Sequence, residues 1–208
     1  DYPRQSFHSY NDASNWQGMD KWGHTYSAFH LTRLLHEVFS SPSVQSGRPM
    51  LKSALFSASF MTAIEVLDGF SSEWGFSWGD VGANAAGLGL YTIQELVFDH
   101  SIVSLKFSYR PSIYADYRPS ALGGSPLEQL FKDYNAQQYW LTFNSPGRAS
   151  EGDDVKWWKF IRPSFGYGAG GMLAGSPNHP VYMSYPAIRP HHRFMLSLDV
   201  DWQMLQVR

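Results

Sequence analysis

Hydrophobic residues in the first half of the chain recur at helical spacing. Over residues 19–39 an apolar side chain returns every third or fourth position, which predicts a helix that ends before Pro42. Pro49 is placed to begin a second helix, and Gly69 is placed to end it. Residues 53–64 of that helix carry no charge. Because this stretch is shorter than the roughly 20 apolar residues of a bilayer-spanning helix, we expect a buried or partly inserted helix.

A third helix is predicted downstream of an aromatic turn. Ser77, followed three residues later by Asp80, resembles a capping box, and the helix that it opens is expected to run to about Phe98. Small residues recur along this segment, and they would allow a neighbouring helix to approach closely. They are Gly82, Ala83, Ala86, Gly87 and Gly89.

The second half of the chain follows the two-residue period of strands. In residues 194–202 the apolar side chains occupy one face and the polar side chains the other, which makes this segment the best strand candidate. Further strands are predicted at 101–109, 139–143 and 160–172, with one short helix inside 127–140 and a polar loop at 146–154.

These patterns predict an α+β fold, with a three-helix unit followed by a half that is rich in strands and loops. Residues 1–18 are polar and are expected to form an extended arm. Residues 19–100 would form the helical unit, and residues 101–208 would pack on it as part of one continuous domain.

Composition narrows the classes of function. The net charge is −2 and no run of Lys or Arg forms a basic stripe, so we expect no nucleic-acid partner. The absence of cysteine removes disulfides, thiolate nucleophiles and cysteine metal sites. Aromatic residues make up 16% of the chain, which is high for a soluble enzyme and is typical of proteins that meet a membrane interface.

Polar residues three or four positions apart mark each of the three predicted helices. Such spacing places side chains on one helical face, and burying an unpaired charge costs several kcal/mol or shifts its pKa. The three groups could therefore converge on one polar centre, which consists of Asp20, Lys21, His24, Glu65, Asp68, Asp80 and Asn84.

Several interpretations of these residues stay open. Asp20 could simply cap the first helix, because Asp is a preferred N-cap residue. Glu65 and Asp68 could lie where the second helix emerges into water. If His24, Glu65, Asp68 and Asp80 met, they would offer the mixed nitrogen and oxygen ligands that suit one divalent Zn, Mn or Fe ion, which could activate water. Alternatively, the centre could be a structural hydrogen-bond network in which Lys21 neutralises a carboxylate.

A second polar motif lies beside a predicted strand. Lys132, Asp133 and Asn135 are interpreted as turn residues that stabilise the local backbone.

Five segments carry a resemblance to a known family. They are Met19–His24 (MDKWGH), Glu65–Phe70 (EVLDGF), Trp74–Asp80 (WGFSWGD) with Asn84 and Gly87, Lys132–Asn135 (KDYN) with Tyr139 and Trp140, and Gly166–Gly168 (GYG) with Met172. Over residues 19–172 this order resembles the YfiM-like family of predicted periplasmic lipoproteins of unknown function. The order of Asp-Lys-x-x-His, Glu and Asp-x-x-x-Asn is also distantly similar to VanZ-like membrane proteins, which have full membrane spans.

The first resemblance implies a location in the envelope of an outer-membrane bacterium, on the periplasmic side of the outer membrane, and no established activity. With the aromatic composition, it leads us to expect an accessory or structural subunit of an outer-membrane assembly, partnered by envelope proteins and the membrane surface. The competing hypothesis is a metal-dependent hydrolase that acts on a lipid or cell-wall substrate.

Overall fold

The computed structural model describes residues 3–44, 47–98, 101–144 and 161–200. The chain divides into two compact units, Asp1–Val97 and Phe98–Arg208, which are called the helical unit and the sheet unit below. The first holds three long helices and the second a four-stranded sheet, so the predicted α+β class is confirmed.

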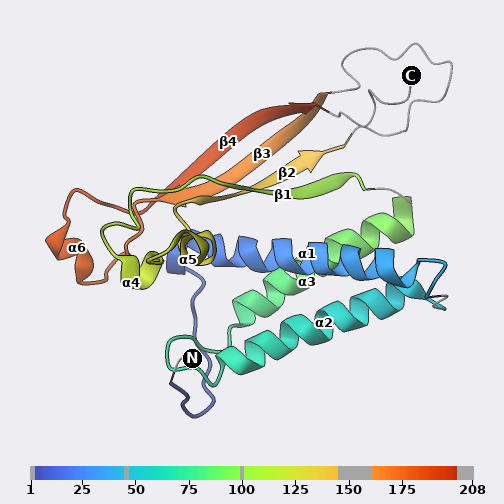
Figure 1. Ribbon diagram of the computed structural model, residues 1–208, viewed down its shortest axis with the longest axis horizontal. Coiled ribbons are helices and arrows are strands. Elements are labelled where there is room, and N and C mark those ends of the chain that lie inside the picture. Colours follow the sequence, from blue (N-terminus) through green and yellow to red (C-terminus); the bar gives the residue numbers. More distant parts are fainter. Residues whose placement is uncertain (1–2, 45–46, 99–100, 145–160, 201–208) are drawn as a thin grey trace. The chain divides into compact units, whose positions relative to one another are not determined.

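The helical unit contains the 3-10 helix η1 (Asn15–Gly18) and the helices α1 (Met19–Phe39), α2 (Pro49–Asp68) and α3 (Trp78–Phe98) (Figure 1). These bounds agree with the predicted helices to within two residues, and Pro49 opens α2 as expected. The backbone of Asp80 donates to the Ser77 hydroxyl at 3.2 Å, which is the predicted capping contact.

The interpretation of Asp20 as an N-cap is wrong. The N-cap of α1 is Gly18, whose φ of 71° lies in the left-handed region that glycine tolerates best. Asp20 is therefore already inside the first helical turn, where its carboxylate interacts favourably with the positive end of the helix dipole. Its side chain contacts Lys21 and His24 of the polar centre.

Close packing of α3 on α1 depends on one small residue. A Cβ atom placed on Gly87 would lie 2.1 Å from the backbone oxygen of Thr25, so no larger residue fits without moving the helices. The Thr25 hydroxyl also reaches across, donating to the backbone oxygen of Ala83 at 3.1 Å. On the other side of α1, Thr32 donates to the Ser57 hydroxyl of α2 at 2.9 Å. Polar contacts thus join all three helices.

The sheet unit is an antiparallel sheet in the order β1-β2-β3-β4. Its strands are β1 (Val103–Tyr109), β2 (Gln137–Phe143), β3 (Ile161–Gly170) and β4 (His191–Val200). Three short helices accompany them, α4 (Pro119–Leu122), α5 (Pro126–Lys132) and α6 (Val181–Ser184). Of these only α5 was predicted, because a single turn has no apolar period to recognise.

The predicted strand segments are confirmed with small changes of bounds. The segment 160–172 ends as a strand at Gly170, and Gly171 forms the expected turn with a φ of 71°. A Cβ atom on Gly171 would lie 2.1 Å from the backbone oxygen of Arg189, so this turn requires glycine. The predicted loop 146–154 and the last residues of the predicted strand 194–202 lie outside the described residues.

Among the described residues, α2 is the helix that reaches the length and apolar composition of a membrane span. The sequence expectation rested on the uncharged residues 53–64, which are too few for a span, whereas the 20-residue helix as a whole is long and apolar enough. Only 22% of its most apolar window is buried inside the protein.

Candidate functional site

The centre of the polar cluster is His24, on the second turn of α1. Its Nδ1 atom lies 3.2 Å from Oε1 of Glu65 on α2 and 3.1 Å from Oδ1 of Asn84 on α3. Both neighbours are hydrogen-bond acceptors, so Nδ1 carries the hydrogen and the lone pair of the neutral ring is on Nε2. The Asn84 amide in turn donates to the same Glu65 oxygen at 3.3 Å. Glu65 and Asn84 therefore fix both the tautomer and the orientation of the imidazole.

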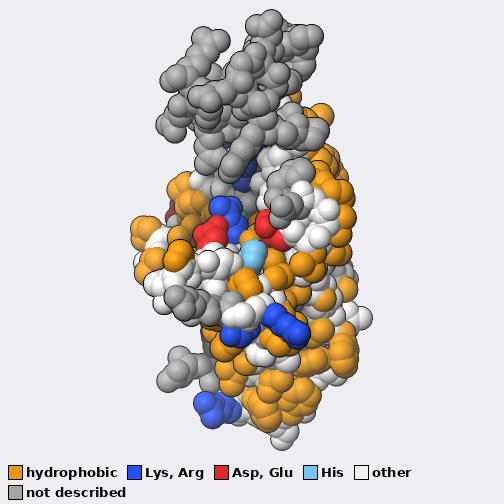
Figure 2. All heavy atoms as spheres, turned by 90° about the vertical axis from the view of Figure 1, so that its right-hand side faces the viewer, with side chains coloured by type: hydrophobic (Ala, Val, Ile, Leu, Met, Phe, Trp, Pro, Cys, Tyr) orange, Lys and Arg blue, Asp and Glu red, His pale blue; other side chains and the backbone are white. Residues whose placement is uncertain are grey.

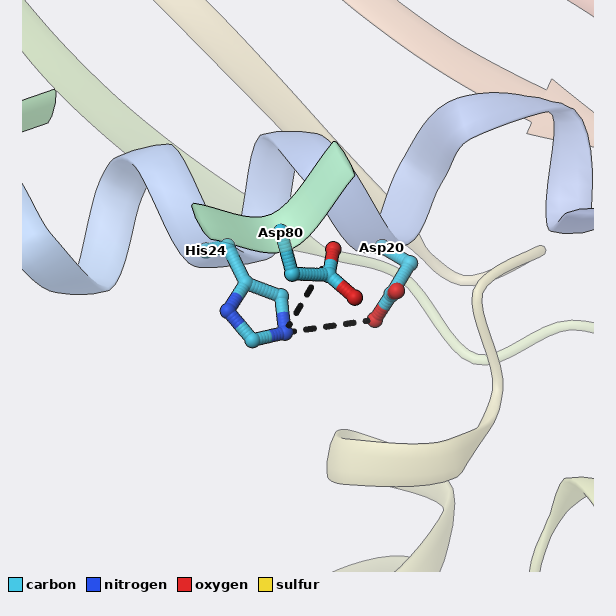
Figure 3. Close-up of side chains that lie close together, drawn as sticks. All are labelled: Asp20, His24 and Asp80. Carbon is cyan, nitrogen blue, oxygen red and sulfur yellow. Dashed lines mark ion pairs between the residues drawn. The ribbon is translucent and has the colours of Figure 1, made fainter. Parts of the chain in front are cut away.

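The other ring nitrogen faces two carboxylates (Figure 3). Nε2 of His24 lies 3.8 Å from Oδ1 of Asp20 and 3.8 Å from Oδ1 of Asp80. One donor atom from each of the three side chains lies within 4.8 Å of the other two. Ligands held about 2.1 Å from a common metal ion lie roughly 3–4 Å apart. The spacing of this triad therefore fits a shared divalent cation.

Lys21 lies beside the triad and binds the same carboxylates. Its Nζ atom is 2.6 Å from Oδ1 of Asp80, 2.8 Å from Oδ2 of Asp12 and 3.2 Å from Oδ2 of Asp20. Although burial lowers the pKa of Lys21, hydrogen bonds to Asp12 and Asp80 outweigh that effect and raise it. The lysine is therefore a fixed positive charge in the centre.

Negative charge exceeds positive charge in this cluster. The ion pairs join four carboxylates, from Asp12, Asp20, Glu65 and Asp80, to one lysine and one histidine. One ammonium group cannot neutralise four carboxylates, and the surplus would be relieved by a bound cation or by protonation.

The pKa values of the two most buried carboxyls of this cluster are raised mainly by burial and further by their negative neighbours. Burial, together with the charges of Asp80 and Asp68, raises the pKa of Glu65 to about 7 despite the opposing effect of His24. Burial and the nearby Asp20 charge raise the pKa of Asp80 to about 6, against the effects of His24 and Lys21. Strongly shifted pKa values inside a cluster of this kind are typical of functional sites.

The structure places the predicted residues in different roles. Glu65 is 1% exposed, so the interpretation that it emerges into water is wrong. It lies on the Nδ1 side of His24, while Asp20, which was not predicted from the sequence as a metal ligand, faces Nε2 together with the predicted ligand Asp80. Asp68 is half-buried on the last turn of α2 and lies outside the triad. Burial raises its pKa too.

Sequence reasoning missed Asp12. It lies in the segment before η1, and its carboxylate also accepts a 2.6 Å hydrogen bond from the Ser77 hydroxyl. Hydrogen bonds to Lys21 and Ser77 lower its pKa, although burial acts in the opposite direction. The polar composition of residues 1–18 gave no periodic signal that could have distinguished Asp12 from its neighbours.

The second polar motif makes contacts with the backbone. Oδ1 of Asp133 accepts from the backbone and side-chain nitrogens of Asn135, and Oδ2 accepts from the Ser112 hydroxyl. The Asn135 amide pairs with both backbone groups of Met172, at 2.8 Å each. Lys132 is the last residue of α5, with Nζ 3.8 Å from a Glu128 oxygen.

Comparison with known proteins gives one family match, which covers the helical part of the chain. Residues 9–95 match the family described as "Predicted periplasmic lipoprotein (DUF2279)". No curated protein and no solved structure matches the chain. The match covers the polar centre but ends before the later motifs of the resemblance, and it supports a location in the periplasmic part of the envelope. Over the part that holds the polar centre, this chain is therefore similar to the predicted periplasmic lipoproteins of DUF2279.

Proposed function

We propose that the helical unit binds one divalent metal ion through Asp20, His24 and Asp80, and that the protein is a metal-dependent hydrolase of the bacterial envelope. One observation carries the proposal: Glu65 and Asn84 anchor Nδ1 of His24 so that Nε2 faces two carboxylate oxygens at 3.8 Å. A carboxylate that orients a metal-binding histidine through its other nitrogen is a recurring feature of metal sites.

Three protein ligands would leave coordination positions for water. This is the arrangement of catalytic rather than structural metal sites, and a metal-held water deprotonates near neutral pH. The side chains of Asp20 and His24 are 24% and 16% exposed, so a small group can reach this side of the triad. Lys21, adjacent to the metal position, would stabilise negative charge that develops on an attacked ester or phosphate.

Metal content is the decisive measurement. We expect protein purified without chelator to contain close to one equivalent of Zn, Mn or Fe by elemental analysis, and His24→Ala to lose it. The matched control is His36→Ala, because His36 lies on the same helix and bonds to Tyr91 outside the cluster. A wild-type protein that takes up no metal even after incubation with these ions would overturn the proposal.

Hydrolysis needs its own test. Wild-type, His24→Ala and His36→Ala proteins would be incubated with phospholipid and with cell-wall fragments, with and without chelator. We expect product release that is abolished by chelator and by His24→Ala only. Product release that is unchanged by chelator, or its absence from the metal-loaded protein on both substrates, would reject the hydrolase assignment while leaving the metal site intact.

An accessory role in an envelope assembly is a second candidate, supported by a different observation. β4 exposes the apolar side chains Phe194, Leu196 and Leu198 at 67%, 85% and 70%. Within the described part of the chain, β4 pairs with β3 along one edge only. A strand with an apolar face and an open edge is a surface that another protein can cover.

The accessory role predicts a partner that survives gentle extraction. Native protein in mild detergent should elute with a second protein, and Leu196→Asp should release it. Met183→Asp is the control, because Met183 is equally exposed on α6. A monomer without a co-purifying protein would sink this candidate.

A further inference from the structure

The two faces of α2 have the reverse of the polarity expected in water. Its buried stripe consists of Ser53, Ser57, Met61 and Glu65, so three of four buried side chains are polar. The opposite side, called the outer face of α2 below, exposes large apolar side chains, which are Leu51, Leu55, Phe56, Phe60 and Leu67. A helix that packs on a core in water normally shows the opposite pattern.

The exposure of the outer face is extensive. Leu67, Phe60 and Leu55 are 66%, 59% and 58% exposed and are spread along the helix from its second turn to its last. Scattered exposed hydrophobic residues are common, but a continuous row of them marks a surface that something apolar covers. On the face of the protein drawn in Figure 2, hydrophobic side chains gather in large exposed groups.

Length and charge favour lipid as the cover. The 20 residues of α2 extend over about 30 Å, and residues 53–64 carry no charge. Arg48 and Lys52 are exposed at the beginning of the helix. Basic side chains there can bind the phosphates of anionic lipids while the apolar row enters the acyl region.

We propose that the outer face of α2 lies in a phospholipid surface, with the helix axis parallel to the membrane plane. The helix would submerge its apolar row and keep its polar stripe turned to α1 and α3, where Ser57 and Glu65 already have partners. The proposal is independent of the metal ion, and it adds a membrane contact made by the protein surface itself.

Vesicle binding tests this proposal. The 208-residue chain has no cysteine that could carry a thioether-linked lipid, so binding by this chain reports its side chains alone. We expect the protein to bind vesicles of phosphatidylcholine with phosphatidylglycerol, and Leu55→Asp/Phe60→Asp to weaken binding at least about tenfold. Both residues are exposed, so folding should be preserved, and circular dichroism would confirm it. Met183→Asp serves as the control.

The absence of cysteine also allows a probe at a single position. Phe60→Cys labelled with an environment-sensitive fluorophore should shift to the blue on vesicles and be quenched by lipids with brominated acyl chains. Ser27→Cys, on the exposed part of α1, should respond much less.

Two results would overturn the proposal. One is equal vesicle binding by the wild type and Leu55→Asp/Phe60→Asp, or an unquenched label at position 60. The other is a wild-type dimer in solution that ignores vesicles and becomes monomeric in Leu55→Asp/Phe60→Asp, which would make the outer face a contact between two copies of the chain.

Discussion

Each unit places an aspartate beside a lysine, but the net effect of the surroundings on the pKa of that aspartate is opposite in the two units. In the helical unit, burial raises the pKa of Asp80 to about 6 although Lys21 lies 2.6 Å away. In the sheet unit, hydrogen bonds from Lys106 and Ser164 outweigh burial and lower the pKa of Asp199. The aspartate beside the lysine is therefore harder to ionise than a free aspartate in the helical unit and easier to ionise in the sheet unit.

The difference comes first from burial, since the side chain of Asp80 is 7% exposed and that of Asp199 is 29% exposed, and then from the neighbours. Among the described residues, the ion pairs join Lys106 to Asp199 and to no second carboxylate, and Ser164 connects Asp199 to Thr142. Asp80 shares Lys21 with Asp12 and Asp20. A network whose charges balance stabilises the fold, whereas one with surplus negative charge is less stable than it could be and is suited to bind a cation.

Replacing Asp80 by Asn should have the largest effect. Metal affinity is expected to fall at least about 100-fold, because loss of a ligand exceeds the 10–100-fold typical of an outer contact. The metal-free variant should nevertheless be more stable than metal-free wild type at pH 7–8, by about 1–2 kcal/mol, because a carboxylate with a raised pKa is removed. Metal titration and urea unfolding measure the two effects.

Asp68→Asn is the matched control for this prediction. The sequence had included Asp68 among the ligands, whereas the structure leaves it outside the triad. Its replacement should change metal affinity by less than about threefold. If Asp68→Asn lost metal and Asp80→Asn kept it, the assignment of ligands would have to be reversed.

The pH dependence of the metal-free protein should be the next largest effect. Glu65 and Asp80 have folded-state pKa values of about 7 and about 6, above their ordinary values of 4.5 and 3.8. Both bind protons more tightly in the folded state, so the free energy of unfolding should fall as the pH rises from about 4 to about 7. We expect a loss of about 1–2 kcal/mol for this interacting pair.

Urea unfolding of chelator-treated protein at several pH values measures this slope. The double variant Glu65→Gln/Asp80→Asn should flatten it, since neither amide titrates. A wild-type stability that rises over the same interval would show that the two carboxyls ionise favourably and that the cluster carries no surplus charge.

Local patterns predicted most of the helices and strands. Pro49 and the Ser77–Asp80 spacing set the starts of α2 and α3, because proline and capping residues act within a single turn. In β4 the alternation of apolar and polar residues predicted the strand, but a two-residue period does not reveal which face is covered. The exposure of Leu196 and Leu198 is a property of the tertiary structure.

The candidate site could be predicted in part. Spacing of three or four residues predicted that polar side chains from three helices would meet, and the structure brings His24, Glu65, Asp80 and Asn84 together. The division of these groups between the two nitrogens of one imidazole depends on helix rotation, which no sequence pattern fixes. That is why Asp20, interpreted as a possible cap, lies in the triad, whereas Glu65, expected as a ligand, lies on the other side of the imidazole.

The smallest effect is expected in the sheet unit. Asp199→Asn should lower the free energy of unfolding at pH 7 by about 1 kcal/mol, because the Lys106 pair is partly exposed to solvent. The folded-state pKa of Asp199 is lowered, so its stabilising effect is present above the ordinary value near 3.8 and is lost as the pH falls below it.

Asp116→Asn, at an exposed position of the same unit, should change stability by less than about 0.5 kcal/mol. Urea unfolding at pH 7 compares the two variants with Asp80→Asn. If Asp199→Asn were stabilising as well, replacing either carboxylate would change stability in the same direction, and the contrast between a balanced and a surplus cluster would not hold.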